Sequence, residues 1–369
     1  MSKLYRRREF LQQLLALTLA GVGAGACGGS KPPTPDLAPD PTPEPERVAP
    51  ASPKPQQGPA ATTAHVPAAP DAAATAAGNT QSPAPEPSAA AVAATTAPLP
   101  DLAVARGAGA DPGELTRRAI AALGGIERFV MPGASVILKP NICNAYHGPE
   151  YASTTNPEVV AAVVALCMGA GARRVQVMDS PFGGTPQNAY ASSGIADAVK
   201  AAGGEMVVMS RLGYRQLAIP GGRKIKQWDV YGDAIDADVL INMPVAKSHG
   251  ATRLTLGMKN LMGIIQDRGG FHSRGLDQCI ADLSTVVRPQ LTVVDAVRIL
   301  LRSGPTGGNL DDVKRADTVI ASADVVAADA YAATLFGMTG ADIGYVRLGA
   351  EMGIGRMDLG AMNVAEIAV

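Results

Sequence analysis

Apolar positions from residue 99 onward fall into short blocks that alternate between two kinds of spacing. Runs of consecutive apolar residues predict buried β-strands, and such runs occupy 135–138, 174–178, 205–209, 239–242, 291–294 and 318–321. Segments in which apolar residues recur every three or four positions predict helices, which occupy 114–129, 157–168, 187–202, 276–287 and 325–336. Strand followed by helix in this order predicts an α/β fold, with a mostly parallel sheet covered by helices on both faces. Turn residues at 220–222 add an antiparallel hairpin.

The first 26 residues have the pattern of an export signal. A basic start precedes an apolar core at 14–22, and small residues lead up to Cys27. The stretch Arg7-Arg8-Glu9-Phe10-Leu11 resembles the twin-arginine motif, and the residues before Cys27 resemble a lipoprotein processing site. We therefore expect export by the twin-arginine route and lipidation at Cys27, with plain cleavage near Ala26 as the alternative.

Residues 27–98 are dominated by Pro and Ala and have neither apolar period. Such a composition buries too little surface to offset its conformational entropy, so we expect a disordered tether. In a polyproline-like conformation it would reach on the order of 200 Å. A lipid at Cys27 would make the protein a periplasmic, membrane-anchored lipoprotein whose α/β domain, 99–369, stands away from the membrane.

Charge and cysteine content exclude several classes of function. The formal net charge is −1, so no global field favours nucleic acid. Cys143, Cys167 and Cys279 are far apart and form no CxxC pair, which excludes an iron–sulfur ligand run or a zinc knuckle. A disulfide between two of them stays open, and the sequence identifies neither a cofactor nor an oligomeric state.

Polar residues and glycines follow the predicted strands in four separate segments. In a parallel sheet the ligand site lies beyond the carboxyl ends of the strands, so these side chains should meet. The candidates are Lys139 and Asn141, Asp179 with Gly183 and Gly184, Lys247 with His249, and Asp295 with Gly304. The two glycines precede a helix, where backbone N–H groups can bind a phosphate or carboxylate.

One stretch, "INMPVAKSHGATRLTLGMKNLMG" at 241–263, holds Lys247, His249, Arg253 and Lys259 without any acidic residue. Solvated helix faces usually mix both signs of charge, so a ligand with carboxylate or phosphate groups would supply the missing counter-charge. Lys259 and Asn260 lie in a predicted helix near 254–265, and Lys259 falls outside its apolar stripe. From spacing alone an exposed lysine is the better interpretation.

Histidines supply the candidate acid–base groups. His249 beside Lys247 suits a donor or a general acid/base, and His272 follows Gly269-Gly270 in a loop that could close over the site. Asp179 and Asp295 could hold a metal together or balance Lys139 and Lys247. A three-histidine metal centre with His147 lacks ligand spacing, so no metal site is predicted.

The order of several short motifs resembles the domain of unknown function family 362, over about 135–337. These motifs are "VILKPNICN", "STTNPEVV", "DSPFGG", "INMPVAKSHG", "GMKNLMG", "VVDAV", "SGPTGG" and "DVVAADAYAA". The resemblance supports the α/β fold and favours Lys259-Asn260 as site residues. Many members of the family resemble iron–sulfur proteins with extra ferredoxin-type cysteines, which this chain lacks, so that role is not carried over.

Two functions from different classes fit these observations. The first is an exported enzyme that acts on a small carboxylate- or phosphate-bearing substrate by a redox or proton-transfer reaction at His249 or His272. The second is a non-catalytic, tethered protein that captures a small anion. Loss of turnover with little loss of binding on changing His249 would distinguish the enzyme.

Overall fold

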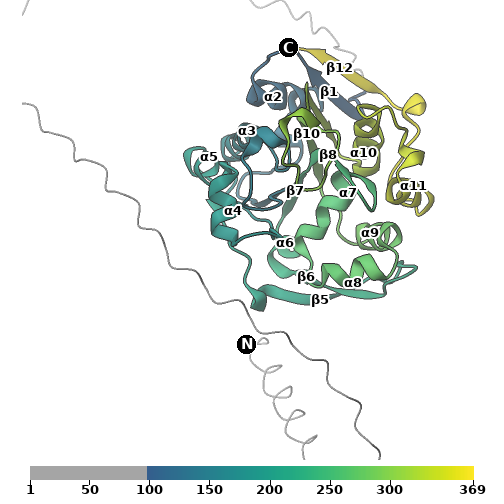
Figure 1. Ribbon diagram of the computed structural model, residues 1–369. Coiled ribbons are helices and arrows are strands. Elements are labelled where there is room, and N and C mark those ends of the chain that lie inside the picture. Colours follow the sequence, from purple (N-terminus) through teal and green to yellow (C-terminus); the bar gives the residue numbers. More distant parts are fainter. Residues whose placement is uncertain (1–97) are drawn as a thin grey trace, which may run out of the picture. The chain divides into compact units, whose positions relative to one another are not determined.

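A ten-stranded β-sheet runs through residues 98–369, the part of the chain that this computed structural model describes (Figure 1). The predicted signal at 1–26, Cys27, and the predicted tether up to residue 97 lie outside the described residues. Across the sheet the strands lie side by side in the order β12 (Val364–Ala368), β1 (Leu102–Arg106), β11 (Val313–Ser322), β10 (Leu291–Leu300), β7 (Val239–Met243), β2 (Ser135–Pro140), β3 (Arg174–Val177) and β4 (Glu205–Met206). Along this path only β11 runs antiparallel to its neighbours.

Two short strands continue the sheet beside the part of β10 that runs beyond the end of β7. β8 (Val245–His249) pairs in parallel with β10, and β9 (Arg253–Thr255) pairs antiparallel with β8. A separate two-stranded sheet consists of β5 (Tyr214–Ala218) and β6 (Gln227–Tyr231), and this is the predicted hairpin. The prediction of a mostly parallel sheet with an antiparallel hairpin is thus confirmed.

Helices cover both faces of the sheet, as Figure 1 shows. One face carries α2 (Pro112–Ala122), α3 (Pro157–Gly169), α4 (Pro186–Ser192) and α5 (Ile195–Ala201). The other carries α6 (Gly232–Asp236), α7 (Gly257–Asn260), α8 (Arg268–Ser273), α9 (Leu276–Ser284), α10 (Val325–Thr334) and α11 (Gly344–Glu351). Single 3₁₀ turns occur at Ile126–Arg128, Pro149–Tyr151, Arg211–Gly213, Leu261–Ile264, Leu310–Asp312, Gly340–Asp342 and Leu359–Ala361.

Strand β2 shows why an uninterrupted apolar run is needed at the centre of such a sheet. Val136 and Leu138 pack into the core under α3, whereas Ile137 packs into the core on the opposite face. Successive side chains of a strand point to opposite faces, so a strand covered on both sides must be apolar throughout. This is the physical reason why the short apolar runs predicted the strands of the parallel sheet.

Several predicted boundaries were wrong for local reasons. The helix expected over 187–202 is two helices, because Gly194 takes a left-handed conformation with φ 72° and starts α5 anew. The helix expected over 114–129 ends at Ala122, before Gly124 and Gly125, which both have positive φ. The strand expected at 291–294 runs on to Leu300 across an irregularity in its pairing with β11.

Two further observations concern the membrane and the cysteines. No helix within residues 98–369 is long and apolar enough to cross a membrane. Cys143, Cys167 and Cys279 are all buried free thiols, so in this structure none of them is part of a disulfide.

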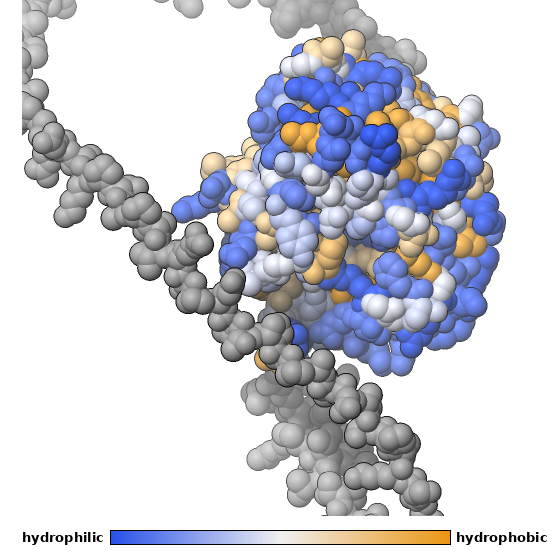
Figure 2. Space-filling view, in the orientation of Figure 1, coloured by the Kyte–Doolittle hydropathy of each residue, from blue (hydrophilic) through white to orange (hydrophobic). Residues whose placement is uncertain are grey.

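The face seen in Figure 2 is mostly hydrophilic, and its apolar residues are scattered in small groups.

Candidate anion-binding site

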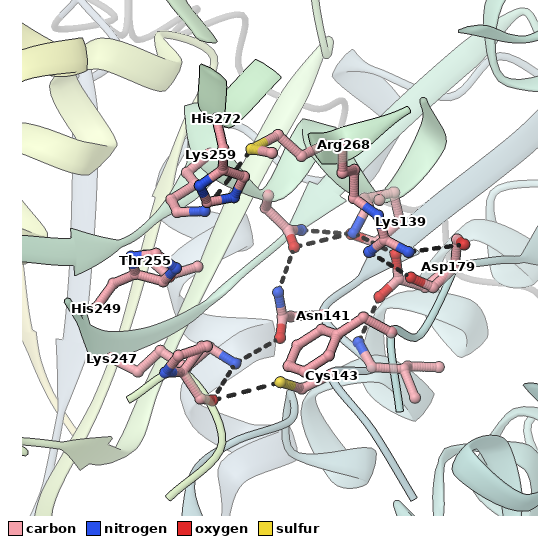
Figure 3. Close-up of a pocket in the computed structure, with 17 residues that line it drawn as sticks. Lys139, Asn141, Cys143, Asp179, Lys247, His249, Thr255, Lys259, Arg268 and His272 are labelled. Atoms are coloured by element: carbon pink, nitrogen blue, oxygen red, sulfur yellow. Dashed lines mark hydrogen bonds and ion pairs between the residues drawn. The ribbon is translucent and has the colours of Figure 1, made fainter. Parts of the chain in front are cut away.

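A pocket of about 310 Å³ opens where β2 and β3 end and β8 begins. Its walls come from the loops after β2 and β3, from β8 and β9, from the segment α7–α8, and from the loop after β10 (Figure 3). The residues that line it are Lys139, Asn141, Ile142, Cys143, Asp179, Ser180, Phe182, Lys247, His249, Thr255, Lys259, Asn260, Met262, Gly263, Arg268, His272 and Pro305. Eight of the predicted site residues are among them, namely Lys139, Asn141, Asp179, Lys247, His249, Lys259, Asn260 and His272.

Lys139 and Asp179 form a buried ion pair at one end of the pocket. Lys139 Nζ lies 2.7 Å from Asp179 Oδ1 and donates to the carbonyl of Pro140, also at 2.7 Å. Asp179 Oδ2 accepts from the backbone N–H of Ile142 at 2.6 Å. Burial lowers the pKa of Lys139, and the Asp179 carboxylate opposes that shift. Lys139 was predicted as a ligand-binding residue, but it is fully buried and already has an internal counter-ion.

The ion pair requires glycine at position 263. A Cβ atom on Gly263 would lie 1.9 Å from Asp179 Oδ1 and 2.4 Å from Lys139 Nζ. No side chain fits there without moving the pair, since both distances are far below van der Waals contact. Gly263, the last residue of the "GMKNLMG" motif, therefore permits the close approach of the backbone to the two charges.

Asn260 joins the two ends of the site. Its Oδ1 accepts from Lys139 Nζ and from Asn141 Nδ2, both at 2.9 Å. Its Nδ2 donates to the carbonyl of Lys139 at 3.0 Å and to Asn242 Oδ1 at 2.9 Å. The amide thus has two donated and two accepted bonds within the protein, and this orients Lys139 and Asn141.

Lys247 lies at the opposite end and is also saturated by the protein. Its Nζ donates to Asn141 Oδ1 at 2.9 Å, to the Ser153 carbonyl at 2.5 Å and to the Pro305 carbonyl at 3.0 Å. Three acceptors use the three N–H groups of an ammonium ion. Burial lowers the pKa of Lys247. The residue adds positive charge to the pocket, but it has no N–H group left for a ligand.

Lys259 differs from both of these lysines. Lys259 is 8% exposed, and the one polar contact of its Nζ within the described part of the chain is the sulfur of Met262 at 3.7 Å. Within residues 98–369 no carboxylate comes within ion-pair distance of it. Burial, followed by the charges of Lys247 and Arg268, lowers the pKa of Lys259 to about 8. The amine is therefore mostly protonated at pH 7, and its N–H groups are available to a ligand.

An unpaired buried ammonium destabilises the fold, so we expect Lys259→Met to raise the free energy of unfolding by about 1 to 3 kcal/mol at pH 7. The amine loses its proton near pH 8 in the folded chain and near its usual 10.5 in the unfolded chain. Wild-type stability should therefore rise between these values, and the gain from Lys259→Met should fade over the same range. Urea unfolding at pH 7 and pH 10 measures both. A gain that does not change with pH would contradict the explanation.

His249 and His272 lie on the same side of the pocket as Lys259 (Figure 3), with ring centroids 6.3 Å apart. Burial, then the charge of Lys259, lowers the pKa of His249 to about 3, so the ring is neutral. Its Nδ1 accepts from the backbone N–H of Ala251 at 3.1 Å, which leaves the proton on Nε2. Burial and Lys259 also lower the pKa of the exposed His272.

The three-histidine centre considered from the sequence is not assembled. His147 stacks on Tyr151 at 4.6 Å between ring centroids and does not line the pocket. Among the described residues, 98–369, no group of three or more His, Cys, Asp and Glu side chains is arranged to hold a metal ion.

Four predicted residues do not line the pocket. Asp295 lies within β10 instead of ending it, and its carboxylate accepts from the N–H groups of Asn156 at 2.7 Å and Val297 at 3.0 Å. Burial raises the pKa of Asp295 to about 6. It therefore neither balances Lys247 nor joins Asp179 at a metal, because its oxygens hold the backbone before α3.

The predicted glycines have packing roles. Gly183 forms a bridge with Asn144, and Gly184, with φ 78°, lies against Ala145. A Cβ atom on Gly304 would lie 1.8 Å from the carbonyl oxygen of Ser248, so glycine is needed there for the loop to approach β8. Gly304 thereby places the next residue, Pro305, whose carbonyl holds Lys247.

Arg253 does not join the pocket cations. It lies on β9 with an exposed side chain and pairs with Asp342 at 3.5 Å. The stretch 241–263 has no acid of its own, but in the fold Arg253 gains a counter-ion from the distant Asp342. The absence of counter-charge along the sequence is real only for Lys247 and Lys259.

Nine residues that line the pocket were not among the predicted site residues, and Arg268, Thr255 and Cys143 are three of them. Arg268 lines the pocket and donates from Nη1 to the Ser180 carbonyl at 2.9 Å. Thr255 is buried, and its hydroxyl has no hydrogen-bond partner in the described chain. Cys143 is buried and its Sγ lies 3.4 Å from the Pro305 carbonyl. Arg268 precedes Gly269-Gly270, and a cation beside that loop was the available signal.

Fold and site together define an α/β protein with a cationic pocket at the carboxyl edge of its parallel sheet. The chain belongs to the family described as "Domain of unknown function (DUF362)", whose match covers residues 136–334. Thylakoid-associated protein sll1697 of Synechocystis sp. (strain ATCC 27184 / PCC 6803 / Kazusa) is 30% identical over 221 residues, which cover 56% of this chain and 64% of that protein. The lactate racemase apoprotein from Thermoanaerobacterium thermosaccharolyticum aligns in structure with a TM-score of 0.37 and 11% identity, covering 60% of this chain and 54% of that one.

Proposed function

We propose that the pocket binds a small molecule with a carboxylate or phosphate group. The observation that carries the proposal is Lys259, a nearly buried ammonium whose N–H groups find no oxygen within the described chain. Buried polar groups are normally satisfied, and a buried charge without a partner is rarer still. A ligand oxygen is the partner that this arrangement lacks.

The charge around the pocket supports the same proposal. Four cationic side chains line it, Lys139, Lys247, Lys259 and Arg268, against the single carboxylate of Asp179. That carboxylate is already committed to Lys139. In a pocket with apolar walls such an excess attracts an anion more strongly than the same charges would in water.

We further propose that the protein is an enzyme acting on this anion. The neutral ring of His249 would donate from Nε2–H to a substrate oxygen, and His272 would accept or return a proton. Their position beside Lys259 supports this assignment. The second candidate is capture without turnover, which the predicted tether at 27–98 favours because a tether extends the range of a binding domain.

The anion site is tested by titrating phosphate and malonate separately into the full-length wild-type chain by calorimetry. We expect saturable binding of at least one of them with one site per chain. Affinity should fall as the pH rises above about 8, because Lys259 then loses its proton. Absence of saturable binding for both anions at pH 7 would refute the proposal.

Export and membrane anchoring remain proposals that follow from Arg7-Arg8 and Cys27. We expect the wild-type protein to sediment with membranes and Cys27→Ala to appear in the soluble exported fraction, because a lipid anchor needs that thiol. Arg7→Lys/Arg8→Lys should keep the protein inside the cell. Equal membrane association of wild type and Cys27→Ala would exclude the lipid anchor.

A further inference from the structure

Lys259 has the surroundings of a nucleophilic amine as well as those of an anion-binding group. We propose that Lys259 Nζ forms an imine with the carbonyl group of a small substrate that also carries a carboxylate or phosphate, such as a 2-oxo acid. This inference rests on the proposed anion site, and it names the class of substrate for that site.

The hydrogen bonds single out this lysine among the three that line the pocket. Lys139 Nζ is held by Asp179, Pro140 and Asn260, and Lys247 Nζ has three oxygen acceptors. An amine whose protons are all held by the protein cannot attack a carbonyl carbon. Among the residues that the structure describes, Lys259 Nζ has only the thioether of Met262 as a hydrogen-bond partner, so the neutral amine can present its lone pair to a carbonyl carbon.

The charges around Lys259 favour the neutral amine that such a reaction needs. Burial and the cations Lys247 and Arg268 lower the pKa of Lys259 to about 8. Roughly a tenth of the amine is then neutral at pH 7, against about one part in several thousand for an unperturbed lysine. Desolvation and neighbouring cations are the two means by which proteins activate a lysine nucleophile.

The same cations would attract the substrate. Lys247 and Arg268 lie on opposite sides of the pocket (Figure 3), and their combined charge draws a carboxylate or phosphate into the space between them, beside Lys259. Binding the anion also offsets the positive field that disfavours a protonated imine. A neutral carbonyl compound gains neither effect, so the anionic group is part of the specificity.

The step is a condensation that needs no oxidant or reductant. The Nζ lone pair attacks the carbonyl carbon, and the electron pair of the C=O π bond moves to oxygen. The first N–H proton passes through His272 to that oxygen and gives a carbinolamine. The second N–H proton follows by the same route as the C–O bond breaks, so the oxygen leaves as water while C=N forms. His249 Nε2–H and the unpartnered hydroxyl of Thr255 can donate to the oxygen, and His272 can accept the proton from nitrogen.

The test is reductive trapping on the full-length chain. The protein is incubated with cyanoborohydride and either pyruvate or glycolaldehyde phosphate, with acetone as the neutral carbonyl. Intact mass and peptide mapping then locate the reduced adduct, and we expect one adduct on Lys259 with an anionic probe. Lys259→Arg keeps the positive charge but cannot form the imine. Lys259→Met is a second variant, of similar side-chain length and without charge. Lys200→Met, at an exposed position in α5, is the matched control.

The outcomes separate this inference from the anion site itself. Three results together support the imine. The adduct disappears in both Lys259 variants, it persists in Lys200→Met, and it becomes less abundant when phosphate competes. The probe that reacts, pyruvate or glycolaldehyde phosphate, identifies the anionic group. A protein that binds phosphate by calorimetry but gives no adduct with either probe overturns the imine and leaves the anion site intact. An adduct equally abundant in the Lys259 variants also overturns it, and absence of both binding and adduct overturns both proposals.

Discussion

We expect Asp179→Asn to lower the free energy of unfolding by about 3 to 5 kcal/mol at pH 7. The substitution keeps the size of the side chain but removes the counter-ion of Lys139, whose side chain is fully buried. The ammonium would then keep only neutral oxygens, those of Pro140 and Asn260 and the amide oxygen introduced at position 179. Removing one partner of a buried pair is strongly destabilising, because the remaining charge stays desolvated without compensation. Urea unfolding followed by circular dichroism measures the loss.

Two further variants make that result interpretable. Asp311→Asn changes an exposed aspartate to the same residue and should alter stability by less than about 0.5 kcal/mol. Lys139→Met combined with Asp179→Leu removes both charges and should recover much of the loss, because an apolar pair of similar volume often replaces a buried ion pair. A loss below about 1 kcal/mol for Asp179→Asn would mean that Lys139 is not held as a charged partner of Asp179.

The second large effect concerns binding. We expect Lys259→Met to weaken the binding of phosphate or malonate by about 10- to 100-fold, since a hydrogen bond to a charged group contributes about 1.5 to 3 kcal/mol. The side chain of methionine is close in length to that of lysine, so the shape of the pocket should change little. The same substitution should stabilise the fold, so a loss of affinity could not be explained by unfolding of the variant.

Lys200→Met provides the matched control, because it removes one exposed lysine from α5 and leaves the pocket lining unchanged. Its affinity for the two anions should equal that of the wild type at physiological ionic strength, where charges beyond about 8 Å are largely screened. If Lys259→Met bound both anions as tightly as the wild type, the free ammonium would not be the ligand group, and Arg268 would become the first candidate.

The fold was largely readable from local pattern. Alternating apolar runs and helical periods identified the strands β2, β3 and β7 and the helices α3, α9 and α10 within a few residues, and the second half of β11. The elements that were not predicted are β1, β8, β9, β12, α6, α11 and α8, which carries His272 where a loop was expected. β8 carries Lys247 and His249 and lacks a long apolar run, because it pairs with β10 at the edge of the pocket and its outer residues are polar.

The site was readable in position but not in role. The rule that ligands bind at the carboxyl ends of parallel strands predicted eight residues that do line the pocket. It failed for Asp295, because the strand that carries it continues to Leu300. The rule also favoured Lys247, which was predicted to follow a strand, over Lys259. The helical spacing placed Lys259 outside an apolar stripe and suggested an exposed side chain.

The sequence by itself determined the alternation of strands and helices, the family, and the set of polar residues that gather at one edge of the sheet. These follow from periodicity and from short motifs, which are local properties of the chain. Only the tertiary structure decided which lysine is free to meet a ligand. Lys139 is hydrogen-bonded to Asn260, 121 positions away, and Lys247 to Asn141, 106 positions away, whereas within residues 98–369 the polar contact of Lys259 Nζ is with Met262 alone. Bonds over such separations exist only once the sheet has formed, so charge along the chain could not reveal which of the cations are already satisfied.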